Sequence, residues 1–230
     1  MSLPEKTRLE AREIIARYPQ PRSALLPMLH LVQSEQGYVS PDGIALCAEE
    51  LGLTKAEVGA VATFYTMYRR RPAGEYHVGV CTNTLCAVLG GDEIMATVKD
   101  QLGIGHNETT EDGKISLEHV ECNAACDYAP VVMVNWEFYD NQTPASTREL
   151  VDACRAGSPP PPTRGPASLC TFKQVSRVLA GFPDGRANEG VQAGAPTLRG
   201  LELAKRRGDV APALPTMDQT SSTLLTTPES

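Results

Sequence analysis

The sequence lacks any long uninterrupted apolar stretch. No run of hydrophobic residues approaches the roughly 20 needed to span a bilayer, so we expect no direct insertion into a membrane. The first ten residues are charged and have no apolar centre, which is not the pattern of a secretory signal. We therefore expect a cytoplasmic protein, in which thiols stay reduced.

Motifs that bind nucleotides or carry out covalent catalysis are also missing. No glycine-rich dinucleotide-binding pattern follows a predicted strand, and residues 103–108 do not match it. There is no Walker loop, no C-x-x-C redox pair and no evident arrangement of nucleophile, histidine and acid. These absences argue against a protein that binds a nucleotide or transforms a substrate by itself.

Basic residues are scarce in the middle of the chain. Residues 73–155 carry four Lys or Arg and fourteen Asp or Glu, a net charge of −10, whereas residues 1–72 carry +1 and residues 156–230 carry +2. Because phosphate binding requires Lys and Arg, this excludes nucleic acid as an expected partner. The acidic excess has two interpretations, a well-solvated surface or electrostatic docking of a protein partner.

Residues 1–72 have the apolar spacing of four short helices. Ser40 and Thr54 are helix-start residues, and Gly37 and Gly52 are helix-stop residues. We predict a helical docking subdomain over this range. The predicted apolar faces are Leu9, Ile14, Ile15 and Tyr18; Ala24, Leu25, Met28, Leu29 and Val32; Ile44, Leu46, Cys47 and Leu51; and Val58, Val61, Phe64 and Tyr65.

Residues 73–156 alternate between strand and helix patterns. Their order, β-α-β-β-α, is that of a small thioredoxin-like sheet. The predicted elements are a strand at 76–80, a helix at 87–102, a loop at 107–113, a strand at 115–120, a hairpin at 131–139 and a helix at 146–154.

Residues 157–230 are rich in proline and poor in aromatics. Ten of the 18 prolines lie after residue 155, with only two aromatic residues, which is too little apolar bulk for an independent core. Two helices are predicted, at 168–180 and 198–207. We expect an arm that orders on a partner's surface, with a disordered tail as the alternative. The predicted fold class is α+β: an N-terminal helical bundle, a thioredoxin-like α/β domain and an extended C-terminal tail.

Four of the seven cysteines form two closely spaced pairs at the ends of predicted strands. Four residues separate Cys81 from Cys86, and three separate Cys122 from Cys126. Four thiolates complete the two tetrahedra of a [2Fe–2S] cluster, and two short loops supply them at a low cost in loop-closure entropy. We therefore predict these four residues as cofactor and metal ligands, in a protein that passes electrons.

Other interpretations of the cysteines stay open. A structural zinc site also takes four cysteines, although its loops are usually shorter. A disulfide needs an oxidising compartment, and a four-iron cluster usually has C-x-x-C runs. His119 is a weak alternative ligand. Cys47, Cys154 and Cys170 lie singly on predicted helices, so we expect them to be core residues.

The cysteine loops resemble those of a known family. The motifs are C-T-N-T-L-C at residues 81–86 and V-E-C-N-A-A-C-D-Y-A-P at residues 120–130. The helical segment adds two further motifs, Q-G-Y-V-S at 36–40 and V-A-T-F-Y at 61–65. Over about residues 20–155 the chain resembles the thioredoxin-like [2Fe–2S] subunit of respiratory complex I, which is the E subunit of NADH–quinone oxidoreductase. The family commonly has glycine in the middle of C-x-x-x-C, where this chain has Ala124.

The resemblance implies an electron-transfer subunit that carries one [2Fe–2S] cluster near the flavin of a partner. FMN and NADH are then expected on that partner subunit, and the other peripheral-arm subunits of complex I as further partners. The complex would hold the chain at the cytoplasmic face of the inner or plasma membrane. The alternatives are the matching subunit of an NAD-linked hydrogenase or formate dehydrogenase, a free [2Fe–2S] ferredoxin, and a zinc-stabilised interaction module.

Overall fold

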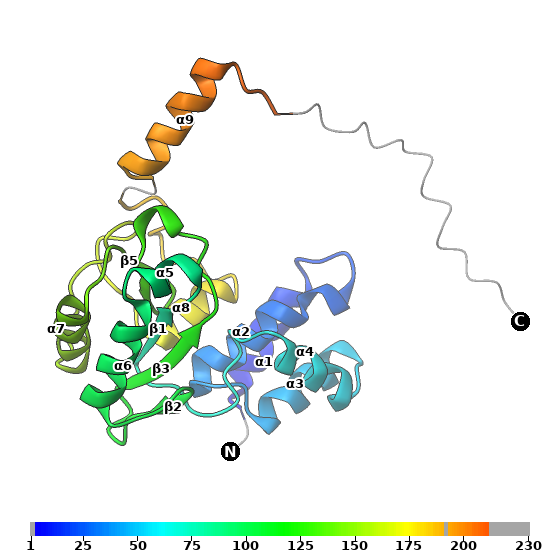
Figure 1. Ribbon diagram of the computed structural model, residues 1–230. Coiled ribbons are helices and arrows are strands. Elements are labelled where there is room, and N and C mark those ends of the chain that lie inside the picture. Colours follow the sequence, from blue (N-terminus) through cyan, green and yellow to red (C-terminus); the bar gives the residue numbers. More distant parts are fainter. Residues whose placement is uncertain (1–2, 191–192, 212–230) are drawn as a thin grey trace, which may run out of the picture. The chain divides into compact units, whose positions relative to one another are not determined.

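The structure is a computed structural model that describes residues 3–190 and 193–211 (Figure 1). These residues fall into two units, one that ends at Gly194 and one that begins at Ala195. None of the described helices is both long and apolar enough to cross a bilayer.

Four α-helices form the N-terminal part of the first unit, as predicted. They are α1 (Glu5–Ile15), α2 (Leu25–Gln36), α3 (Pro41–Leu51) and α4 (Lys55–Phe64), with a short 3-10 helix, η1 (Pro21–Ala24), before α2. The Ser40 side chain accepts a hydrogen bond from the N–H of Gly43, and Thr54 forms a capping box with Glu57. The caps that start α3 and α4 are therefore those that the sequence indicates.

The predicted apolar faces of two helices are partly wrong. Leu9 of α1 is 57% exposed and Phe64 of α4 is 79% exposed. The face of α1 that packs on α2 and α3 holds Ile14, as predicted, but its other buried residues are Thr7 and Ala11. Periodicity reveals that a helix exists, but the position of its neighbours decides which side is buried.

A five-stranded mixed sheet follows, in the order β2-β3-β1-β4-β5. The central strand β1 is buried throughout, and it runs parallel to β3 and antiparallel to β4. Helices α6 and α7 contact each other and β1, and they cover one face of the sheet (Figure 1). The elements are β1 (Tyr76–Cys81), α5 (Thr84–Val88), α6 (Gly91–Leu102), β2 (Glu108–Thr109), β3 (Ile115–Val120), η2 (Cys126–Tyr128), β4 (Val132–Val134), β5 (Glu137–Tyr139) and α7 (Pro144–Arg155).

The single helix predicted at 87–102 is in fact two helices, α5 and α6. Gly90 lies between them with a φ of 109°, a left-handed conformation that an α-helix does not accommodate. The predicted loop at 107–113 likewise contains the short strand β2, which pairs antiparallel with β3.

Residues 157–190 do not form the separate extended arm that we expected. Helix α8 (Phe172–Leu179) packs against α2, and Phe172, Ser176 and Ala180 on one side of it are fully or almost fully buried. Arg177 pairs with Glu10 of α1 at 2.8 Å. This segment lacks the apolar bulk for a core of its own, so it completes the core of the preceding helices instead.

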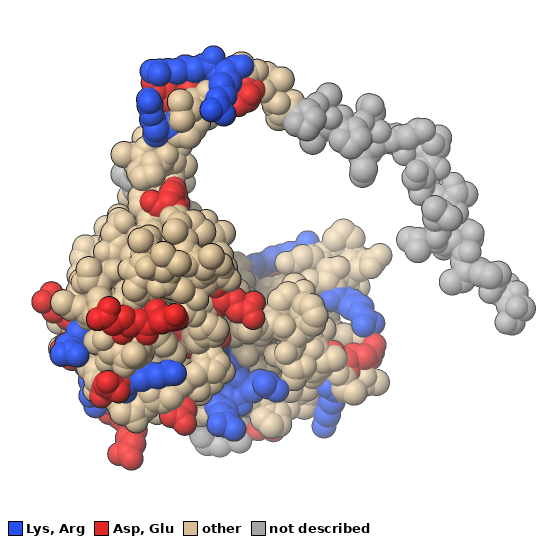
Figure 2. All heavy atoms as spheres, viewed as in Figure 1, with Lys and Arg blue, Asp and Glu red and all other residues tan. Residues whose placement is uncertain are grey.

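The second unit consists of α9 (Ala195–Arg207) and the residues after it. None of its side chains is buried among the described residues, and its last turn carries Lys205, Arg206 and Arg207. Figure 2 shows these basic side chains at the end of α9 and many Asp and Glu side chains over the part of the chain that holds the sheet. The expectation that the end of the tail orders on a partner stays a prediction.

Candidate metal centre

Both cysteine loops leave the sheet at the same edge. β1 ends at Cys81, and its parallel neighbour β3 ends at Val120, directly opposite Cys81 in the register. Parallel strands present their carboxyl ends together, so Cys122 and Cys126 follow β3 beside the loop that holds Cys86. The topology thus brings the two pairs, which 35 residues separate in the sequence, to the same end of the parallel strands β1 and β3.

The first pair is buried and closely confined. The side chains of Cys81 and Cys86 are 3% and 4% exposed. Gly91, the first residue of α6, lies against both: a Cβ added there would be 2.6 Å from the carbonyl oxygen of Cys81 and 2.9 Å from that of Cys86. Only glycine leaves room for this close approach of α6 to the loop.

The second pair is exposed and lies in a loop that leads into the short 3-10 helix η2. Cys122 and Cys126 are both exposed, and Ala124 between them has a φ of 52°. The N–H of Ala124 donates to Cys122 Sγ at 3.3 Å. The left-handed backbone of Ala124 explains why glycine suits this position, and why alanine here carries strain.

A small apolar wall surrounds the buried thiols. It consists of Ala125, Tyr128 and Val131, which pack with Cys81 and Cys86 in one cluster. Burial raises the pKa of the Cys86 thiol to about 11, its neighbours Cys81 and Cys126 add to this, and the N–H of Val131 acts against it. A metal must therefore displace a proton from Cys86 when it binds.

The structure does not bring all four thiols to ligating distances. Across residues 3–190 and 193–211, no three His, Cys, Asp or Glu side chains form a ready metal site. The four cysteines nevertheless fit a four-thiolate group: none is in a disulfide, they meet at one edge, and two of them accept backbone N–H bonds of the kind that stabilise a thiolate.

The other three cysteines lie away from this edge. Cys47 and Cys154 are fully buried, in the helical core and the sheet core, and burial raises the pKa of each thiol to about 12. Their prediction as core residues is confirmed. Cys170 is only half-buried, and its Sγ accepts a hydrogen bond from Arg186 at 2.8 Å, so its prediction as a core residue is wrong.

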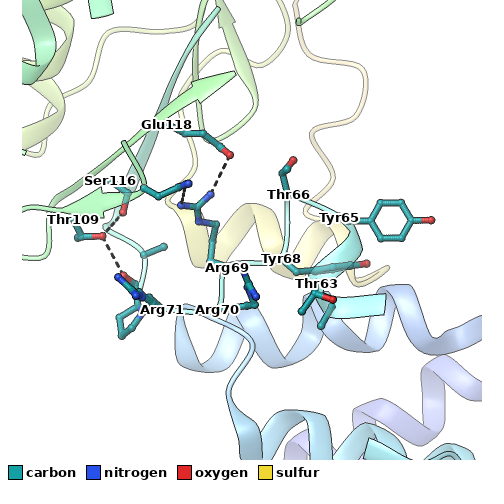
Figure 3. Close-up of a pocket in the computed structure, with 14 residues that line it drawn as sticks. Thr63, Tyr65, Thr66, Tyr68, Arg69, Arg70, Arg71, Thr109, Ser116 and Glu118 are labelled. Carbon is teal, nitrogen blue, oxygen red and sulfur yellow. Dashed lines mark hydrogen bonds and ion pairs between the residues drawn. The ribbon is translucent and has the colours of Figure 1, made fainter. Parts of the chain in front are cut away.

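A cavity lies away from this site, between α4 and the sheet (Figure 3). It has a volume of about 540 Å³ and contains no cysteine. Arg69 lies in it and pairs with Glu118 of β3 at 3.3 Å, and Glu118 in turn contacts His77 at 2.7 Å. This ion pair ties the helical part to the sheet, and burial lowers the pKa of His77.

The chain matches a family model described as thioredoxin-like [2Fe-2S] ferredoxin over residues 11–155. It is 64% identical over 212 residues to the E subunit of NADH-quinone oxidoreductase from Mycobacterium tuberculosis (strain ATCC 25618 / H37Rv), covering 92% of this chain and 84% of that protein. The E subunit of the same enzyme from Rickettsia bellii (strain RML369-C) is 41% identical over 148 residues, covering 63% and 89%. The mycobacterial alignment therefore includes most of the tail.

A solved structure of an NAD+-reducing [NiFe]-hydrogenase in the H2-reduced state has a similar fold. The TM-score is 0.53 with 20% sequence identity, over 59% of this chain and 22% of that chain. At this identity the likeness concerns the fold alone. Together with the family match, it agrees with the predicted thioredoxin-like α/β domain next to an N-terminal helical part.

Proposed function

The chain belongs to the thioredoxin-like [2Fe-2S] ferredoxin family, among the E subunits of NADH–quinone oxidoreductases, and on this basis we propose that Cys81, Cys86, Cys122 and Cys126 ligate one [2Fe–2S] cluster. The observation that carries the proposal is the meeting of two cysteine loops at one sheet edge. Cys81 and Cys86 pack there in one cluster with Ala125 and Tyr128 from the second loop.

The residues of the site have separate tasks. A bound cluster supplies reversible one-electron reduction and oxidation. The apolar wall of Ala125, Tyr128 and Val131 keeps water from the first pair of cysteines. The second pair lies at the surface, where a partner's redox group can come close.

An apolar surface beside the site fits such a partner. Leu85, Val88 and Leu89, in or next to α5, are 42%, 78% and 53% exposed. They flank Cys86 in the sequence, so a protein that covers them also approaches the cluster ligands. Exposed apolar residues grouped in this way are typical of a protein interface.

We assign the chain the role of the electron-transfer subunit of an NADH–quinone oxidoreductase. FMN and NADH would lie on a partner subunit, with other peripheral-arm subunits alongside, and the complex would hold the chain at the cytoplasmic face of the inner or plasma membrane. The similarity over most of the chain to the E subunits of these oxidoreductases supports this role over that of a hydrogenase subunit, a formate dehydrogenase subunit or a free ferredoxin. The hydrogenase likeness concerns the fold only.

Anaerobic purification of the full chain tests the cluster. We expect red-brown protein with about two irons per chain and, after reduction by dithionite, an EPR signal from one unpaired electron. Cys86→Ala should abolish or alter the signal. Cys47→Ala is the matched control, since Cys47 is equally buried but lies in the helical core, and it should leave the signal intact. Colourless protein with one zinc would rule the cluster out.

Reduction by NADH tests the partner. NADH added to the isolated chain should leave the cluster oxidised, because the chain has no nucleotide-binding motif. Addition of the flavin-bearing subunit should allow NADH to reduce it. Reduction of the isolated chain by NADH would contradict the assignment of both cofactors to the partner.

A further inference from the structure

The first part of the C-terminal tail is fastened to strand β5. The N–H of Thr163 donates to the carbonyl of Phe138 at 2.9 Å, and the Thr163 hydroxyl donates to an Asp140 carboxylate oxygen at 2.8 Å. The Tyr139 hydroxyl donates to the carbonyl of Pro160 at 2.7 Å. Residues 160–164 therefore follow the end of β5 rather than extending into solvent.

Arg164, the next residue, contacts both Asp140, directly after β5, and Tyr128 beside the cysteine site. Its Nε and Nη2 donate to the two carboxylate oxygens of Asp140 at 3.0 and 3.2 Å, and the Asp140 side chain is only 6% exposed. The guanidinium carbon lies 3.9 Å from the ring centre of Phe138 and 4.8 Å from that of Tyr128. A planar guanidinium held by two hydrogen bonds in this way is fixed in orientation over both rings.

Tyr128 is the member of the apolar wall that Arg164 covers. It belongs to η2, the same turn as Cys126, and it packs with Cys81 and Cys86. Its hydroxyl is buried and has no hydrogen-bond partner among the described residues, so the packing of its ring must hold it in place. On the hydroxyl side, Gly194 lies so close that a Cβ would not fit.

We propose that Arg164 is a positioning residue for the cysteine site, which acts from the C-terminal tail by holding Tyr128 against the buried thiols of Cys81 and Cys86. Its relevance to a cluster depends on the proposed function, but the contact itself does not. Arg164 lies beyond residue 155, where the family match ends, so this role belongs to the tail and not to the shared domain.

Alkylation of the metal-free, reduced full chain tests the proposal. Each cysteine is followed by mass spectrometry during reaction with iodoacetamide. In Arg164→Ala we expect Cys81 and Cys86 to react about tenfold faster, because local opening of the wall becomes easier. Cys47 and Cys154 lie in the other two cores and should keep their rates, which separates local opening from general unfolding.

Arg177→Ala is the matched control. Arg177 is also in the tail, pairs with Glu10 and lies 4.4 Å from the ring centre of Phe182, but it does not contact the cysteine site. It should leave the rates of Cys81 and Cys86 unchanged. Arg164→Lys keeps the charge but loses the planar contact, so an intermediate rate is expected.

Three results would overturn the proposal. They are unchanged rates at Cys81 and Cys86 in Arg164→Ala, an equal rise at Cys47 and Cys154, and the same rise in Arg177→Ala. A second readout is the loss of iron to a chelator from the loaded chain, which Arg164→Ala should speed up and Arg177→Ala should not. A wild-type chain without iron would defeat the proposed function, yet the alkylation result would still decide the role of Arg164.

Discussion

The two cysteine pairs are built in different ways. Cys81 and Cys86 are buried and belong to regular elements, the end of β1 and helix α5. Cys122 and Cys126 are exposed, Cys122 in a loop with a left-handed alanine and Cys126 at the start of the short 3-10 helix η2. One half of the site is therefore held rigidly by the sheet and α6, while the other half has room to adjust when a metal binds.

This difference has a consequence for assembly of the site. Gly91 lies in close contact with the backbone of both cysteines of the first pair. The second pair is ordered by the N–H of Ala124 on Cys122, by the turn of η2 that begins at Cys126, and by the wall residues Ala125 and Tyr128. We expect the first pair to act as a preformed anchor and the second to close over the cluster.

The largest expected effect is the difference in thiol reactivity within the wild-type chain. In the metal-free, reduced protein, Cys122 and Cys126 should react with iodoacetamide on the order of a hundredfold faster than Cys81 and Cys86, because buried thiols react only after local opening. Mass spectrometry of each cysteine peptide measures the rates. Equal rates for the two pairs would mean that the first pair is not held as described.

Gly91→Ala should displace the loop that holds Cys81 and Cys86. The added Cβ meets backbone atoms of Cys81 and Cys86 rather than a flexible side chain, so we expect a loss of about 1–3 kcal/mol in the free energy of unfolding and a lower iron content. Urea unfolding and iron analysis measure both.

Gly59→Ala is the control for that substitution. Gly59 lies in α4, and a Cβ there has no neighbour within 4 Å, so the variant should be as stable as the wild type or up to about 1 kcal/mol more stable. If both variants were equally stable and equally loaded with iron, the close approach at Gly91 would not matter.

Ala124→Gly should relieve the second half of the site, with the smallest effect of the three. Removal of the Cβ from a residue with a φ of 52° should raise the free energy of unfolding by about 1 kcal/mol. Urea unfolding of the metal-free chain measures it. Ala125→Gly is the control, since the φ of Ala125 is −117°, and it should lower the stability. A loss of stability in Ala124→Gly would show that the loop is not strained.

Much of the local structure follows from short sequence signals. Ser40 and Thr54 mark the helix starts, and the spacing of the cysteines marks two ligand loops at strand ends. The resemblance at residues 81–86 and 120–130 points to the same four cysteines. The sequence shows that Ala124 stands where the family commonly has glycine. The structure shows why glycine is favoured at this position, because the backbone there is left-handed.

Other features could not be predicted from the sequence, because they depend on contacts between residues far apart in the chain. The break at Gly90 had a local signal, the pair Gly90-Gly91, but the helical pattern on either side concealed it. Tyr128 lies inside the resemblance motif, yet nothing in the motif indicates that it covers Cys81 and Cys86. Arg164 lies in a proline-rich stretch, where its contact with Asp140 cannot be read from composition.

Sequence signals that span only a few residues predicted the class of fold, the helical and sheet segments, and the four thiols that a cluster would use. Periodicity, capping and spacing are all of this local kind. The folded molecule was needed to learn which thiols are buried, which helix faces are covered, and that the tail returns to the helices and to the cysteine site. Burial is a property of residues brought together from distant parts of the chain, as Arg164 and Tyr128 are.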